Sequence, residues 1–194
     1  MPAAKADFPT LFFESPQQWE AWLAAEHARA DGIWIKMAKK ATGIPSVDWP
    51  GAVEVALCYG WIDGQRRPLD ETYFLQKFTP RRARSPWSKV NIGHVERLTD
   101  AGRMQPAGLA EIERAKADGR WARAYEPPSR VTVPPDLQAA LDANAKAAAF
   151  FATLKGTNRY AVLYRVQDAK RPETRARRIA TFVQMLERGE TLYP

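Results

Sequence analysis

Cationic and aromatic side chains are concentrated between Gly60 and Asn91, in the sequence GWIDGQRRPLDETYFLQKFTPRRARSPWSKVN. The basic residues of this stretch run from Arg66 to Lys89, and Tyr, Phe and Trp lie among them. Buried cations are costly unless they are paired, so most of these charges should face water or a ligand. Arginine forms forked hydrogen bonds with carboxylates and phosphates, and Trp or Tyr stacks on bases or guanidinium groups. The stretch therefore predicts a surface that binds an anionic small molecule or protein partner.

The residues that we expect on this surface are two tryptophans, one aspartate and the neighbouring basic residues. They are Trp61, Asp63, Arg66, Arg67, Arg81, Arg82, Arg84, Trp87 and Lys89. The loop 81–88 is the main candidate, because binding residues are disproportionately found on loops. The structural alternative is a solvated loop that Trp87 anchors to the core.

Asp63 has two interpretations. It follows Gly60-Trp61-Ile62 and precedes Gly64, where we predict a turn over 60–64 between a helix and a strand. Its carboxylate could accept hydrogen bonds from a ligand or act as a base. Alternatively, it bonds turn amides or pairs with Arg66 or Arg67.

The sequence holds no dinucleotide-binding, Walker, metalloprotease or serine-hydrolase motif. His27 and His94 lie far apart and have no ligand-spaced partners, so we predict neither a metal site nor a cofactor. Cys58 lies four residues after Glu54, and a neighbouring carboxylate raises a thiol pKa, which disfavours a nucleophile. We therefore predict no catalytic residue. An enzyme with Asp63 or Glu54 as acid or base is kept as an alternative.

Arg175 is a further candidate, in the last predicted helix. It lies one turn before Ile179 and close to the apolar stripe of that helix. An arginine in such a position either pairs with a carboxylate or lines a cleft. Both interpretations stay open at this point.

Composition indicates a globular protein with a basic surface. The 194 residues are 45% hydrophobic, and 29 Lys+Arg against 22 Asp+Glu give a net charge of +7. This charge suits nucleic acid, anionic lipid or small anions, and it also suits a merely solvated surface. One cysteine excludes an intramolecular disulfide, and no apolar run is long enough for a signal peptide or a membrane span. We therefore expect a cytoplasmic protein, whose oligomeric state the sequence does not indicate.

Hydrophobic periodicity predicts an α+β fold, with a small N-terminal β-sheet and packed helices followed by an all-helical C-terminal part. In the first half, the predicted strands are 11–14, 32–40, 64–68 and 72–79. The predicted helices there start at Ser15 and at Asp48, both good N-caps.

The second half is predicted to be helical. Helices are expected over about 91–100, 106–119, 136–154 with a break near Asn144, 157–169 with Thr157 as cap, and 172–189. Four prolines in 126–135 interrupt this pattern. We therefore predict a domain over 1–126, a proline-rich linker over 127–135 and a helical region over 136–194.

Two groups of segments resemble a known family. In the C-terminal part they are Ala149-Phe150-Phe151, Asn158-Arg159-Tyr160 and AKRPETRARRI at 169–179. In the N-terminal part they are LCYGWID at 57–63, FTPR at 78–81 and WSKVN at 87–91. On these segments the chain resembles the YdeI/OmpD-associated family, also described as bacteriocin-protection proteins.

The resemblance implies a stress-response role in protection from antimicrobial peptides and a link to an outer-membrane porin. It supplies no catalytic residues, and this chain has Gly64 where a small polar residue such as Ser is expected. It makes Arg175 a family feature, either as a fold element or as a site. A protein without an export signal should not meet such a porin directly, so we expect any link to be indirect.

These observations lead to three hypotheses. The first is a cofactor-free, non-catalytic protective protein that binds an anion through the surface defined above. The second is a nucleic-acid-binding protein that uses the same stretch together with 175–178. The third is the enzyme alternative, with an arginine clamp for an anionic small molecule.

Overall fold

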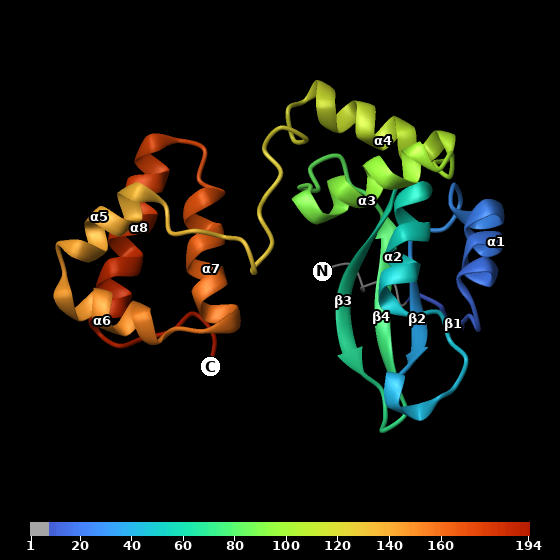
Figure 1. The fold of residues 1–194 in the computed structure, drawn as a ribbon, viewed down its shortest axis with the longest axis horizontal. Coiled ribbons are helices and arrows are strands. Elements are labelled where there is room, and N and C mark those ends of the chain that lie inside the picture. Colours follow the sequence, from blue (N-terminus) through green and yellow to red (C-terminus); the bar gives the residue numbers. More distant parts are fainter. Residues whose placement is uncertain (1–7) are drawn as a thin grey trace, which may run out of the picture. The chain divides into compact units, whose positions relative to one another are not determined.

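The computed structural model describes residues 8–194, which form two compact units (Figure 1). One unit ends at Ala124 and the other spans Tyr125–Pro194. The described part of the first unit combines a β-sheet with helices, whereas the second unit is helical. The α+β class predicted from the sequence is therefore confirmed.

The elements of the first unit are β1 (Thr10–Phe12), α1 (Pro16–Glu26), β2 (Ile33–Ala38), the 3-10 helix η1 (Lys40–Thr42), α2 (Trp49–Cys58), β3 (Trp61–Pro68), β4 (Tyr73–Pro80), α3 (Lys89–Asp100) and α4 (Pro106–Ala117). Those of the second unit are α5 (Pro135–Asp142), α6 (Ala145–Thr153), α7 (Gly156–Gln167) and α8 (Pro172–Glu187).

The sheet has the strand order β1-β2-β4-β3 within the described residues. β1 pairs parallel with β2, and the other two pairs are antiparallel. The hairpin between β3 and β4 turns at Asp70, whose Oδ1 accepts hydrogen bonds from the backbone N–H groups of Thr72 and Tyr73, each at 2.7 Å. A bulge between Asp63 and Arg66 shifts the register of β3.

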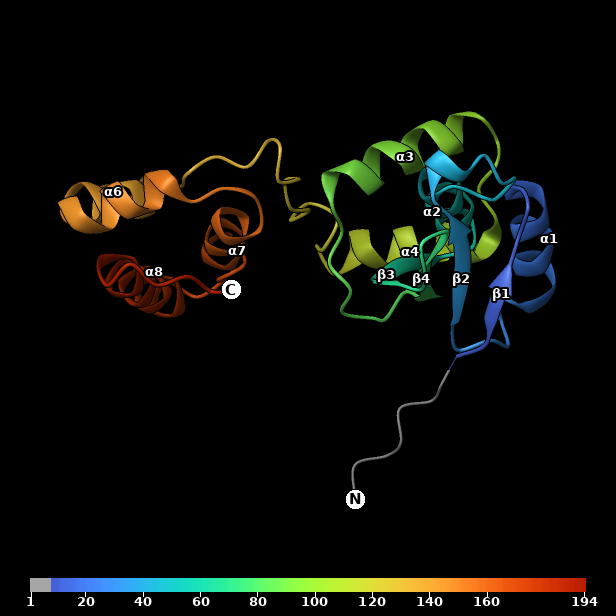
Figure 2. The ribbon, with the colours of Figure 1, turned by 90° about the horizontal axis from the view of Figure 1, so that it is seen from below.

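One face of this sheet forms the core of the first unit. Successive residues of a strand point to opposite faces. In β2, Ile33, Ile35 and Met37 are fully buried and pack in the core with residues of α1 and α2. Helix α2 lies over this face in both ribbon views (Figures 1 and 2).

Side-chain caps mark the starts of α1, α2, α3 and α6. Ser15 and Asp48 cap α1 and α2, and Asn144 caps α6 and separates it from α5. Ser88 caps α3, which therefore begins at Lys89, two residues earlier than predicted. The predicted cap Thr157 is wrong, because α7 begins at Gly156 after Lys155.

The predicted turn over 60–64 is also wrong. The turn is complete at Gly60, which has a left-handed φ of 73° and follows the cap residue Tyr59, and β3 begins at the next residue. Trp61 already pairs with Pro80, and Asp63 pairs with Phe78. Asp63 therefore lies in a strand rather than in a turn.

The second unit has a separate apolar core. Among its most buried members are Leu137 and Leu141 of α5, Ala147 of α6, Val162, Leu163 and Val166 of α7, and Leu186 of α8. Among the described residues, no helix of either unit is long and apolar enough to cross a membrane.

Candidate functional site

Arg81 is a buried arginine that directly follows β4. Its backbone N–H donates to the carbonyl of Gly60 at 3.0 Å, which fixes the chain as it leaves the sheet. Its side chain turns inward, so that the residue is 5% exposed. The guanidinium lies 3.7 Å from the ring centroid of Trp87, and Nη1 donates to the carbonyl of Pro86 at 3.3 Å. The loop after β4 therefore folds back over its own arginine.

Arg120 approaches the same loop from the turn after α4. Its Nε donates to both carboxylate oxygens of Asp118, at 2.9 and 2.7 Å, and Nη1 donates to the carbonyl of Ser85 at 2.9 Å. The side chain is 10% exposed. The hydrogen bond from Arg120 holds the pKa of Asp118 below its usual range. Arg120 thus joins the end of α4 to the loop between β4 and α3.

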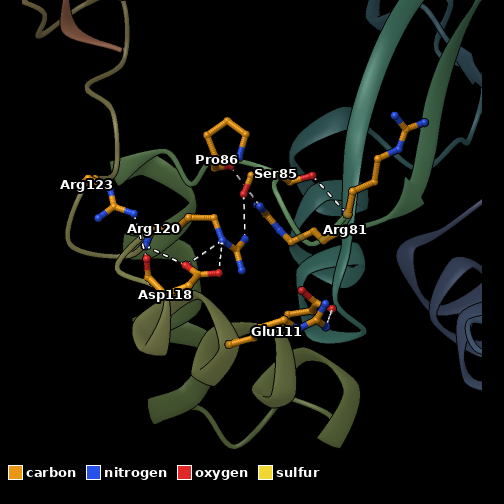
Figure 3. Close-up of polar contacts among 9 residues, drawn as sticks. Arg81, Ser85, Pro86, Glu111, Asp118, Arg120 and Arg123 are labelled. Carbon is orange, nitrogen blue, oxygen red and sulfur yellow. Dashed lines mark hydrogen bonds and ion pairs between the residues drawn. The ribbon is translucent and has the colours of Figure 1, made fainter. Parts of the chain in front are cut away.

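Two guanidinium groups therefore converge on adjacent backbone carbonyls. Arg120 bonds the carbonyl of Ser85 and Arg81 bonds that of Pro86, as Figure 3 shows. We call Arg81, Ser85, Pro86, Trp87 and Arg120 the Arg81–Arg120 site. Arg120 is also paired with Asp118, so its own charge is balanced at this site.

The site also contains buried donors that lack an acceptor. In the described part of the chain, Nη2 of Arg120 and the indole Nε1 of Trp87 are buried and have no hydrogen-bond partner. A buried donor left unsatisfied costs about 1–3 kcal/mol. Oxygen atoms of a carboxylate or phosphate are acceptors that suit arginine and indole N–H donors of this kind.

Glu111 of α4 is the buried carboxylate nearest in sequence to the turn after α4 that carries Arg120. It is 8% exposed and pairs with Arg114 on the next turn of the helix. A Cβ at Gly60 would lie 2.9 Å from its Cγ, so glycine at that position leaves room for the side chain. Arg114 balances its charge.

The sequence did not single out Arg120. It lies 39 positions from Arg81, and no periodicity links a turn after one helix to a loop after a strand. The signal that could have identified it is local. Asp118-Gly119-Arg120-Trp121 places a carboxylate, a helix-ending glycine, an arginine and an indole side by side.

Of the predicted surface, the structure brings Arg81 and Trp87 together. Arg82, Arg84 and Lys89 lie nearby in the chain but are exposed. Trp87 itself is 2% exposed and packs against Trp121, with ring centroids 5.0 Å apart. The tryptophan is therefore both a core anchor and the surface on which Arg81 stacks.

Trp61 lies in the core of the first unit. It is 1% exposed, and its ring meets those of Trp19 and Trp22 edge-on at centroid distances of 6.2 and 5.8 Å. Its Nε1 donates to the carbonyl of His27 at 3.3 Å. Packing accounts for all of these contacts.

Arg66 and Arg67 are exposed on β3 and stack on opposite faces of the sheet. Arg66 lies 3.8 Å from the ring centroid of Phe74, and Arg67 lies 3.8 Å from that of Trp34. Neither residue contributes to the Arg81–Arg120 site.

Arg175 connects three helices of the second unit. It forms a forked ion pair with Asp136 of α5, at 2.5 and 2.8 Å, and donates to the carbonyl of Val166 of α7 at 2.7 Å. Arg175 and Asp136 also line an apolar groove of about 580 Å³ along α5 and α8. The ion pair and the cleft that the sequence left open are thus both present.

The two carboxylates considered as acid or base lie in different environments. Asp63 is part-buried and accepts a hydrogen bond from Trp49, and burial raises its pKa. Glu54 pairs with Arg97 at 2.7 Å, and this hydrogen bond lowers its pKa. A lowered pKa keeps Glu54 ionised, which does not suit a proton donor near neutral pH.

The remaining candidate for covalent chemistry is Cys58. Burial raises the pKa of its thiol to about 11, so the thiolate is scarce near neutral pH. Among the described residues, no group of three or more His, Cys, Asp or Glu side chains could hold a metal ion.

Two family models match this chain. Residues 11–111 match the model described as Domain of unknown function (DUF8412), and residues 130–189 match the model described as Bacteriocin-protection, YdeI or OmpD-Associated. No curated protein and no solved structure matches it. The resemblance noted in the sequence is therefore confirmed over the C-terminal part. The N-terminal segments that were compared with the same family lie within the first match.

Proposed function

This chain belongs to the family described as Domain of unknown function (DUF8412), and we propose that it is a non-catalytic anion-binding protein that uses the Arg81–Arg120 site. The observation that carries the proposal is that the buried guanidinium of Arg81 and the part-buried guanidinium of Arg120 bond the adjacent carbonyls of Pro86 and Ser85. The buried donors of Arg120 and Trp87 supply the hydrogen bonds that such an anion accepts.

A carboxylate or phosphate group is the chemical class that this arrangement fits. Arg120 presents one donor inward while its other donors hold Asp118 and Ser85. Its position is therefore fixed before a ligand binds, which lowers the entropic cost of binding. Trp87 adds a second donor and holds the Arg81 guanidinium flat against its ring.

Calorimetric titration of the full chain with inorganic phosphate and with succinate tests this proposal. Arg120→Gln removes the inward donor, and Arg123→Gln is the matched control, because Arg123 is exposed in the same turn. A charge-assisted hydrogen bond contributes about 1.5–3 kcal/mol, so Arg120→Gln should weaken binding roughly tenfold or more. Arg123→Gln should change it less than about twofold.

Two results would overturn the proposal. One is the absence of binding by either anion at low salt. The other is an equal loss in the two variants, which would mean that net charge rather than the site attracts the anion. Thermal unfolding of each variant separates lost binding from lost structure.

We also propose that the chain acts in the cytoplasm and protects against antimicrobial peptides. The support is the match of residues 130–189 to the bacteriocin-protection model. Survival of a bacterial strain challenged with a bacteriocin, with and without expression of the chain, tests this role. Equal survival would reject it, and the result does not depend on anion binding at the Arg81–Arg120 site.

A further inference from the structure

The face of the sheet turned away from α2 carries rings and cations instead of a core. In β2, Trp34 and Lys36 alternate with the core residues and point to this second face. In β4, Tyr73, Leu75 and Lys77 do the same. Trp34 and Leu75 are buried, yet neither belongs to the core of either unit. We call this second face the outer sheet face.

Each cation of the outer sheet face lies over an aromatic ring. Nζ of Lys36 lies 4.5 Å from the ring centroid of Tyr73 and 5.3 Å from that of Phe12. Nζ of Lys77 lies 5.9 Å from the ring of Trp34, and Cζ of Arg67 lies 3.8 Å from the same ring. Rings and cations thus extend over all four strands. Neighbouring strands lie about 4.7–4.9 Å apart, so this face is about 14 Å wide from β1 to β3.

Among the described residues, no negative charge balances these cations. The residues that point to the outer sheet face include no Asp or Glu in any of the four strands. Within the described part of the chain, Lys36, Arg67 and Lys77 form no ion pair. The positive charge of this face is therefore available to an external anion.

We propose that the outer sheet face binds single-stranded nucleic acid. Such a ligand supplies both partners that the face lacks, since its phosphates pair with lysine and arginine and its bases stack on aromatic rings. Phe12 is 36% exposed and Tyr73 is half-buried, so both rings are accessible for stacking. An anionic membrane would supply phosphates but no planar groups for the rings.

This inference goes beyond the proposed function, because the outer sheet face shares no residue with the Arg81–Arg120 site. Of the residues that the sequence assigned to a basic surface, it uses Arg67. Trp34 and Lys36 of β2 lie outside the stretch 60–91, whereas Tyr73 and Lys77 of β4 lie within it but were not among the residues assigned to the predicted surface. A four-stranded sheet places them on one face.

Fluorescence anisotropy of a labelled fifteen-nucleotide oligo-dT, titrated with the full chain over a range of salt concentrations, tests the proposal. The wild type should bind with an affinity that falls steeply as salt rises. In the double variant Lys36→Gln/Lys77→Gln, the slope of log affinity against log salt should shrink by about 1.4, or about 0.7 for each phosphate that is no longer neutralised. Tyr73→Ala should weaken binding roughly fivefold or more, because a base can no longer stack on its ring.

Two controls make the outcome specific. Lys39→Gln/Lys40→Gln removes the same charge from residues that lie outside the outer sheet face, and it should leave the slope within about 0.3 of the wild-type value. Arg120→Gln should leave oligonucleotide binding unchanged. This variant therefore distinguishes a wrong proposal for the outer sheet face from a wrong proposal for the Arg81–Arg120 site. Absence of binding at low salt, or an equal slope change in both lysine pairs, would overturn the proposal. Binding to vesicles of anionic lipid without binding to oligo-dT would overturn it in favour of a membrane surface.

Discussion

Asp63 and Trp49 connect the middle of β3 to the first residue of α2. Oδ2 of Asp63 accepts a hydrogen bond from Nε1 of Trp49 at 3.2 Å. The indole is held in this position although Trp49 is 47% exposed. The carboxylate is part-buried, and burial raises its pKa although this hydrogen bond and the charge of Arg81 act in the opposite direction. Folding therefore costs more free energy for the charged form of Asp63 than for its neutral form.

Asp63→Asn should stabilise the protein at neutral pH. A folded-state pKa above the unfolded value means that Asp63 contributes most favourably when protonated, and that this contribution is lost as pH rises through the folded pKa. The neutral amide keeps an oxygen for Trp49 and carries no charge to desolvate. Urea unfolding at pH 3 and pH 7 measures the effect. The stability of the variant minus that of the wild type should be larger at pH 7 than at pH 3. A smaller difference at pH 7 would mean that the ionised carboxylate is the favoured form.

Gly108 is the point of closest approach between α4 and the end of α2. A Cβ at this position would lie 2.3 Å from the carbonyl oxygen of Cys58, a backbone atom that cannot move aside. Gly108→Ala should therefore destabilise the first unit by about 1–3 kcal/mol or more.

Gly93→Ala is the matched control for this substitution. Gly93 lies within α3 and a Cβ there meets no atom within 4 Å, so alanine should stabilise by roughly 0.5–1 kcal/mol through helix propensity. Denaturant unfolding of both variants measures the difference. Similar stabilities would mean that α4 shifts away from α2 at little cost.

Arg175 should contribute to stability through Asp136. Removing Arg175 breaks the forked ion pair and leaves the carbonyl of Val166 without this donor, so Arg175→Ala should cost about 1–3 kcal/mol. Arg177→Ala, two residues on and exposed, should stay within about 0.5 kcal/mol of the wild type. A double-mutant cycle with Asp136→Asn isolates the pair, and additive losses would contradict a coupling between the two residues.

The same pair predicts a pH dependence. The hydrogen bond from Arg175 lowers the pKa of Asp136, so the folded pKa lies below the unfolded value. The contribution of the pair is therefore present above an unfolded pKa of about 3.9 and is lost as pH falls through the folded pKa. Thermal unfolding from pH 6 to pH 2 should show this loss in the wild type and a smaller one in Asp136→Asn.

Local signals in the sequence predicted the helices and strands better than the sites. Ser15 and Asp48 mark helix starts because capping depends on residues three positions apart. Trp61 shows the limit of such local signals. A tryptophan suits both a core and a binding surface, and only its neighbours in the fold decide between the two. Arg81 and Arg120 reach the same loop only because α3 and α4 bring the chain back to it, which no periodicity encodes. The outer sheet face likewise depends on strand order.

The C-terminal unit should fold by itself, as the predicted linker over 127–135 implies. The core residues that it buries lie between Leu137 and Leu186, and among the described residues they form a cluster separate from that of the first unit. A fragment spanning Tyr125–Pro194 should give a helical circular dichroism spectrum and a cooperative thermal transition. A fragment that starts at Ala145 lacks α5, with Leu137, Leu141 and the Asp136 partner of Arg175, and it should lose the transition. An unfolded longer fragment would mean that the second unit depends on the first, and the predicted boundary would then separate segments of one cooperative domain.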